Sequence, residues 1–204
     1  MRGFFQLSST RSLRRKFNFA TFTTRCAKSL REAALLDADL EVLDLTEGED
    51  LVCKNMMCEK LGRGCACKLA LWLSQNSTEE GRGDGKHGVH LTLREVFLDN
   101  SGLDVLPDPL WSLTALEVLS CASNRIEKVP RGIMDLPRLR VVNLAQNPLQ
   151  EVPDFLFDSS TLEQIILSED CSLKLGERED WTSSRFAADG FVKFHRRATK
   201  DERD

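Results

Sequence analysis

The sequence predicts an α/β solenoid: a stack of short repeats whose strands form one parallel sheet, with a capping segment at each end. Two observations support this prediction. Apolar residues recur in register at one fixed period through residues 91–175, and each period combines a strand-like alternation with a helix-like spacing. The chain has 204 residues, of which 41% are hydrophobic and 29% charged, and this composition suits a globular domain with extensions.

The repeat period is visible in columns of aligned residues. The first column is Leu93, Leu116, Leu139 and Leu162, each 23 residues after the one before. The next columns are apolar and then polar: Val96, Leu119, Val142 and Ile165; Leu98, Cys121, Leu144 and Leu167; Ser101, Asn124, Asn147 and Asp170. A further apolar column holds Leu106, Val129 and Val152, and proline follows each of its members.

This pattern resembles the leucine-rich repeat family, whose consensus is L-x-x-L-x-L-x-x-N-x-L. The proline after the apolar position resembles the intracellular scaffold branch of that family, which includes Ras-suppressor-like proteins. The resemblance covers residues 91–175, less than half of the chain. It implies a short leucine-rich repeat solenoid whose parallel concave sheet binds a partner protein. Ser101 and Asp170 stand where the consensus has asparagine, as is typical of the first and last repeats of an array.

The same residues have a direct physical interpretation. The alternation that ends L-x-x-L-x-L predicts a short, half-buried strand. Asn124 and Asn147 follow the strands, where their amides can satisfy backbone groups of the turning chain. Proline then stops strand pairing, and the spacing of Ile133 and Leu136 predicts one short helical turn. Stacking of such repeats makes a continuous core, and four repeats exceed the usual minimum of about three.

One charged column predicts ion pairs between the repeats. Its members alternate in sign: Arg94, Glu117, Arg140 and Glu163. Parallel strands lie ~4.8 Å apart, so adjacent members can pair along the solenoid. We expect a structural role for this charge ladder, because the charges satisfy one another.

The segments that precede the repeats are expected to cap the first of them. Residues 32–78 are expected to form a mainly helical, cysteine-rich N-terminal cap, in which residues 68–73 pack against the first repeat. The letters LEVLDL at residues 40–45 also fit a degenerate repeat strand, and that alternative stays open. A glycine-rich loop is expected at residues 79–90.

Residues 176–204 are expected to form a C-terminal cap and a charged tail. The cap extends from Trp181 to about Phe194, where aromatic residues stand in a charged background. His195 beside it is interpreted as a solvated surface residue. The chain has only three histidines, and none stands in a recognisable arrangement with a nucleophile and an acid.

Four of the seven cysteines lie close together in the N-terminal cap. They are Cys53, Cys58, Cys65 and Cys67. Their spacing is C-x4-C-x6-C-x-C, not the paired C-x2-C of zinc knuckles, so buried structural thiols are favoured over a metal site. No metal ligand and no cofactor is assigned. Cys121 occupies a core column of the repeat and is expected to be an inert buried thiol.

The N-terminal arm, residues 1–31, contains eight Lys or Arg residues and no Asp or Glu. Eight Ser or Thr residues are interleaved with them. This composition is typical of an organelle transit peptide, and an intracellular, mitochondrial location is favoured over a cytoplasmic one. A disordered basic arm and an arm that binds nucleic acid or anionic lipid are the alternatives.

These features together predict a non-catalytic protein–protein interaction module and not an enzyme. No apolar run reaches the ~20 residues needed to span a bilayer, and no small-molecule substrate is expected. Two alternatives remain: a structural protein of a nucleic-acid or organelle complex, held by its basic arm, and a cysteine-rich metal or redox protein. The partner is expected on the outward residues of the sheet, with Phe97 as the anchor. These residues are Glu95, Phe97, Asp99, Val118, Ser120, Val141, Asn143, Gln164 and Ile166.

Overall fold

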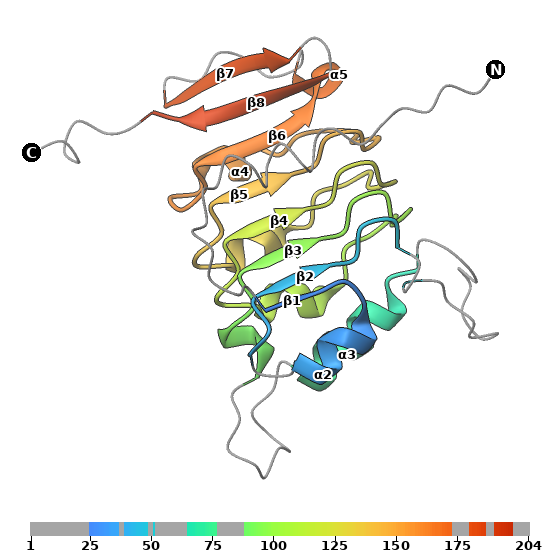
Figure 1. Ribbon diagram of the computed structural model, residues 1–204. Coiled ribbons are helices and arrows are strands. Elements are labelled where there is room, and N and C mark those ends of the chain that lie inside the picture. The colour runs from blue at the N-terminus through green and yellow to red at the C-terminus, as the bar shows by residue number, and fades with distance from the viewer. Residues whose placement is uncertain are drawn as a thin grey trace, which may run out of the picture.

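The computed structural model describes residues 25–36, 39–48, 51, 65–76, 88–172, 180–186 and 190–197. Within these ranges the protein forms one sheet of eight strands in the order β1-β2-β3-β4-β5-β6-β8-β7 (Figure 1). The strands are β1 (Cys26–Ala27), β2 (Val42–Asp44), β3 (Glu95–Phe97), β4 (Val118–Ser120), β5 (Val141–Asn143), β6 (Gln164–Ser168), β7 (Trp181–Phe186) and β8 (Phe191–Arg196). β1 to β6 are parallel, whereas β8 is antiparallel to β6 and β7. The predicted α/β class with a parallel sheet of short strands is confirmed.

Short helical elements connect the strands. They are α2 (Leu30–Leu36), α3 (Cys67–Asn76), α4 (Phe155–Asp158), α5 (Glu169–Ser172) and the 3₁₀ turns η3 (Val89–Leu91), η4 (Asp108–Ser112) and η5 (Arg131–Asp135). Pro107 and Pro130 precede η4 and η5 with φ of −75° and −66°, so the single helical turn expected in these repeats is confirmed. In the part of the chain described, no helix has the length and apolarity to cross a membrane.

The strands pair at the repeat period, and this register builds the core. Val96 lies opposite Leu119, Leu119 opposite Val142, and Val142 opposite Ile165. All four side chains are fully buried in one continuous apolar cluster that extends through every repeat. Because strand side chains alternate between faces, the residues between them point to the other side of the sheet.

The sheet begins earlier than the sequence predicted. Leu43 of β2 lies opposite Val96, and Ala27 of β1 lies opposite Leu43. The prediction of a mainly helical cap was therefore wrong for residues 40–45, where the alternative of a repeat strand is correct. The physical reason is burial: L-x-x-L-x-L places Leu40, Leu43 and Leu45 against the first repeat with 0–2% exposure. The boundary of the arm at residue 31 was also wrong, because β1 and the start of α2 belong to the fold.

Two helices cover the repeats at the β1 end of the sheet (Figure 1). Ser29 caps the N-terminus of α2, where its Oγ accepts the backbone N–H of Glu32 at 3.0 Å. Glu32 Oε2 in turn accepts the backbone N–H of Lys28 at 2.8 Å. α3 lies against η3 and η4, and its Leu69 and Leu73 are fully buried. The expected packing of residues 68–73 against the first repeat is confirmed.

The β7–β8 hairpin closes the opposite end of the sheet (Figure 1). Trp181 and Phe194 both meet the ring of Phe157 edge-on, with ring centroids 5.5 Å apart. The indole Nε1–H of Trp181 also donates to the carbonyl oxygen of Phe157 at 3.1 Å. The segment expected to form a C-terminal cap therefore covers the last repeat with aromatic side chains.

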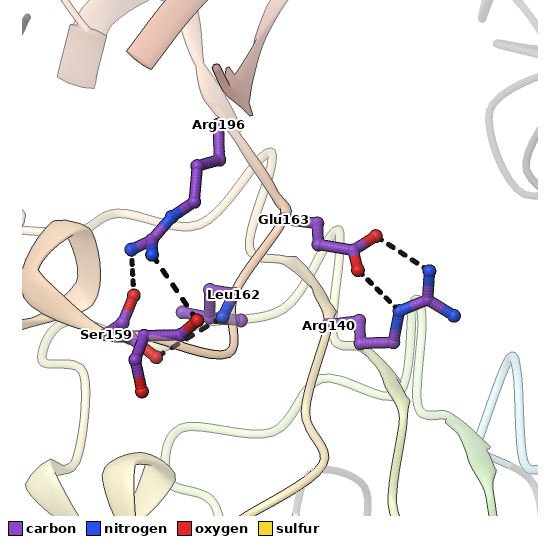
Figure 2. Close-up of polar contacts among 6 residues, drawn as sticks. Arg140, Ser159, Leu162, Glu163 and Arg196 are labelled. Atoms are coloured by element: carbon purple, nitrogen blue, oxygen red, sulfur yellow. Dashed lines mark hydrogen bonds and ion pairs between the residues drawn. The ribbon is translucent and has the colours of Figure 1, made fainter. Parts of the chain in front are cut away.

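Arg196 connects the β7–β8 hairpin to the loop before β6 through hydrogen bonds. Its guanidinium donates to the carbonyl oxygens of Ser159 and Ser160, and its contact with Ser159 is drawn in Figure 2. The same group lies 5.3 Å from the centroid of the Trp181 ring. Ser159 Oγ accepts the backbone N–H of Leu162 at 3.3 Å, which orders the turn that Arg196 reaches.

Candidate functional site

The candidate site is the outward face of the sheet, which we define as the strand face opposite the main core. Strand register arranges its residues in three rows. Row 1 is Val42, Glu95, Val118, Val141, Gln164 and His195. Row 2 is Asp44, Phe97, Ser120, Asn143, Ile166 and Lys193. Row 3 continues past the strand ends with Asp99, Ala122, Ala145, Ser168 and Phe191. All nine residues predicted for partner binding fall in these rows.

Most of the residues predicted for partner binding have little contact with solvent. Six of the nine residues predicted for partner binding are buried, and the other three are partly exposed. Phe97 is 3% exposed, Ile166 2% and Asn143 1%. Val118, between Glu95 and Val141 in row 1, is one of the partly exposed residues.

Polar side chains of the outward face bond to one another across three strands. Asn143 Nδ2–H donates to Ser120 Oγ at 3.0 Å. The Ser120 hydroxyl donates to Asp99 Oδ1 at 2.7 Å, and the backbone N–H of Ala122 donates to the same oxygen at 2.6 Å. Hydrogen bonds to a charged acceptor are stronger than neutral ones, so this chain of contacts fixes the middle of the face.

A second apolar cluster lies on the outward face, separate from the main core. It consists of Ala122, Ala145, Ile166 and Phe191. Lys193 Nζ lies 5.5 Å from the centroid of the Phe191 ring, so the cap adds a cation and an aromatic ring to this face. Sequence reasoning missed both residues. The signal that could have found them is the alternation in FVKFHR, where Val192 and Phe194 are core residues and Phe191 and Lys193 are not.

Charge on the outward face is divided between its two ends. Asp44, Glu95 and Asp99 place three carboxylates on and beside β2 and β3, the strands nearest the N-terminal entry to the sheet. Lys193 is the cation at the β8 end. The face therefore presents an acidic end next to the point where the chain joins β1.

Beneath this face, the asparagine column satisfies the backbone as the sequence predicted. Asn124 Nδ2 donates to the carbonyl oxygens of Leu98 and Cys121, while its Oδ1 accepts the backbone N–H groups of Ser101 and Leu103, all at 2.8–3.1 Å. Each asparagine therefore connects its own repeat to the preceding one. In the first repeat Ser101 replaces asparagine, and its Oγ donates to the carbonyl oxygen of Leu45 at 3.0 Å.

The predicted charge ladder is present at the entrance to the strands. Arg94 Nη1 lies 3.1 Å from Glu117 Oε1. Arg140 forms two hydrogen bonds with the carboxylate of Glu163, as Figure 2 shows. These hydrogen bonds raise the pKa of the Arg140 guanidinium, and burial lowers it by a smaller amount. The negative charges of Glu163 and Glu117 raise it further. The ladder therefore consists of two close pairs that also influence each other.

The described cysteines differ in exposure, and Cys26 is partly exposed. The Cys121 thiol is fully buried, and burial, helped by the negative charge of Asp99, raises its pKa well above the ordinary value. Cys65 is 2% exposed, whereas Cys67 is exposed. Cys53 and Cys58 lie outside the described residues. Within the described ranges, no three His, Cys, Asp or Glu residues gather as metal ligands would.

A depression lies away from the outward face, on the loops that follow β3, β4 and β5. Its lining is mostly charged or polar: Asp104, Val105, Arg125, Glu127, Lys128 and Pro148. Ligand pockets are usually lined by apolar and aromatic side chains, whereas four of the six residues here carry a charge. We therefore keep the outward face as the candidate site.

No known protein family model matches the chain, and neither does any curated protein. A solved structure of a leucine-rich repeat protein from Leptospira interrogans is similar, with 22% identity and a TM-score of 0.42. The alignment covers 68% of this chain and 33% of that protein, so this chain spans about a third of its length. We base the fold on the register of the chain's own strands.

Proposed function

We propose that this protein is a non-catalytic scaffold that binds a partner protein through the outward face of its sheet. The observation that carries the proposal is the set of three rows in register, with an apolar cluster separate from the main core. Partly exposed residues, Glu95, Val118 and Gln164, stand in row 1 of the same face. Pro107, Pro130 and Pro153 support assignment to the intracellular scaffold type of leucine-rich repeat.

The size of the face limits how it can bind. The rows cross six strands, and six strands at ~4.8 Å spacing by five residues at ~3.3 Å give a face of roughly 500 Å². A standard interface buries about 800 Å² on each partner. The partner therefore also contacts the edge of the sheet, and residues 68–90 before β3 are the segment that we propose for this contact.

A matched pair of valine variants tests the face. Val118 is partly exposed in row 1, whereas Val105 is 56% exposed in a loop away from the sheet. Co-purification with the wild-type chain identifies the partner, and calorimetry with the purified partner then compares Val118→Arg with Val105→Arg. We expect Val118→Arg to weaken binding by more than about tenfold, or ~1.4 kcal/mol, and Val105→Arg to leave it unchanged. Equal affinity of the two variants would contradict the proposal.

We also propose that the N-terminal arm directs import into an organelle, with the mitochondrion favoured. Its support is composition alone: eight basic residues and no acidic residue in residues 1–31. Residues 1–24 lie outside the described residues, and Arg25 is where the described chain begins. Mass spectrometry of the mature N-terminus is the test. A cytosolic protein that retains Met1 would contradict the proposal.

A further inference from the structure

Phe97 is buried on the outward face although its two neighbours in row 2 have short side chains. Phe97 stands in row 2 between Asp44 and Ser120, whose side chains are both shorter than a phenylalanine ring. Strand side chains stand roughly perpendicular to the sheet, so the outer part of the ring rises above both neighbours. The ring is nevertheless only 3% exposed, and it belongs to neither apolar cluster of the described residues. Phe97 therefore has contacts beyond these two neighbours and the two clusters.

The segments outside the described residues differ sharply in composition. Phenylalanine, tryptophan and tyrosine occur in only one of them, residues 1–24. Its aromatic residues are Phe4, Phe5, Phe17, Phe19 and Phe22, and its basic residues are Arg2, Arg11, Arg14, Arg15 and Lys16. It has no Asp or Glu. A segment of this kind complements a face that combines apolar side chains with carboxylates.

The point of attachment and the length of this segment also fit. Residue 24 leads directly into Arg25 and β1, at the edge of the sheet and beside the acidic end of the outward face. Twenty-four residues can extend to about 80 Å, at roughly 3.3 Å each. The eight strands, at ~4.8 Å spacing, span only about 34 Å from β1 to β7. The arm is therefore long enough to cross every strand.

We propose that residues 1–24 dock on the outward face, with their basic side chains over Asp44, Glu95 and Asp99 and their phenylalanines over Phe97 and the second apolar cluster. The arm then acts as an intramolecular competitor of the partner protein. Its removal, or its displacement by a stronger ligand, uncovers the face. This regulatory consequence rests on the proposed function, but the docking itself does not.

The docking test uses the full chain and measures the accessibility of Phe97 by hydroxyl-radical footprinting with mass spectrometry. One variant reverses four arm charges: Arg11→Glu, Arg14→Glu, Arg15→Glu and Lys16→Glu. A second variant removes arm aromatics: Phe17→Ser, Phe19→Ser and Phe22→Ser. A matched control reverses four charges in other segments outside the described residues: Lys174→Glu, Arg178→Glu, Lys200→Glu and Arg203→Glu. We expect severalfold faster oxidation of Phe97 in either arm variant and no change in the control.

A synthetic peptide of residues 1–24 gives a second measurement. We expect it to bind the charge-reversed full chain, with affinity that falls as salt rises, and to bind the wild-type chain far more weakly because the face is already occupied. Two results would overturn the docking proposal. One is protection of Phe97 that persists in both arm variants, with a dimeric mass in solution identifying a second copy as the cover. The other is exposure of Phe97 in the control variant. If the arm docks but no partner competes with it, the proposed function fails and the docking stands.

Discussion

Arg140 and Glu163 face each other at the entrances to β5 and β6, joined by hydrogen bonds of 2.8 and 2.9 Å to the two carboxylate oxygens. They are one repeat apart, like Arg94 and Glu117, whose charged atoms are 3.1 Å apart. The side chains of Arg140 and Glu163 are 49% and 54% exposed, so solvent screens the pair. Each pair therefore contributes only about 0–1 kcal/mol to stability.

Reversal of the charge in the middle of this ladder is expected to destabilise the protein. Glu117→Lys removes the pair with Arg94 and places a cation between Arg94 and Arg140. We expect a loss of about 1 kcal/mol, or roughly 2–4 °C in Tm, at low salt, and a smaller loss in high salt. Thermal unfolding at two salt concentrations measures it. Glu151→Lys, at an exposed carboxylate outside the ladder, is the control. Equal Tm values for the two variants would show that the ladder is fully screened.

Asn124 is expected to be the most sensitive polar position of the repeats. Asn124→Ala leaves backbone groups of Leu98, Ser101 and Leu103 without their side-chain partner. A buried polar group that loses its partner costs about 1–3 kcal/mol, and we expect a total loss of about 2–3 kcal/mol after relaxation. Urea denaturation measures the free energy of unfolding. Gln150→Ala, which removes an exposed hydrogen bond to Glu127, should change it by less than about 0.5 kcal/mol. A loss no larger than in this control would argue against the asparagine column as a stabilising element.

Gly48 should tolerate a methyl group less well than Gly190 does. Both glycines have positive φ, 60° and 68°, so alanine is strained by about 1 kcal/mol at either position. A Cβ on Gly48 would also come within 2.8 Å of Ser101, whereas a Cβ on Gly190 meets nothing within 4 Å. We therefore expect Gly48→Ala to lower the free energy of unfolding clearly more than Gly190→Ala in the same denaturation experiment. Equal losses would mean that the repeat containing β2 does not pack tightly on the next one.

Cys121 is expected to make the protein less stable in alkaline solution. Burial and the charge of Asp99 raise the pKa of its thiol in the folded state, while the unfolded chain releases the proton near the ordinary value of 9.0. The pKa of the thiol is therefore higher in the folded protein than in the unfolded chain. For this reason the contribution of the protonated thiol to the free energy of unfolding is fully present below pH 9.0 and is lost as the pH rises beyond it. For one titrating group, the free energy of unfolding falls by up to about 1.4 kcal/mol per pH unit.

The test compares the wild type with Cys121→Ala across this pH range. The variant is less stable at neutral pH, because a buried sulfur atom is lost and a small cavity remains. Other titrating groups are common to both proteins, so their effects cancel in the difference. We expect the difference in free energy of unfolding to shrink as the pH rises above 9.0. Parallel stability curves would contradict a raised pKa for this thiol.

The sequence by itself determined the repeated part of this protein, because there the determining interactions are periodic. Leu93 and Leu116, Arg94 and Glu117, and Asn124 and Asn147 each stand 23 residues apart, so one alignment shows which side chains meet in adjacent strands. The core, the charge ladder and the asparagine column all follow from that period.

Only the tertiary structure decided what lies outside the period. Leu43 and Val96 lie opposite each other although 53 residues separate them, so β2 breaks the 23-residue spacing and no search for that period can find it. Phe191 and Lys193 lie on the outward face because β8 runs antiparallel to β6. This strand direction depends on pairing between distant segments of the chain. The burial of Phe97 is likewise a tertiary property. The solvent exposure of a side chain depends on every segment that packs over it. The alternation of residues in a strand shows only on which face of the sheet the side chain lies.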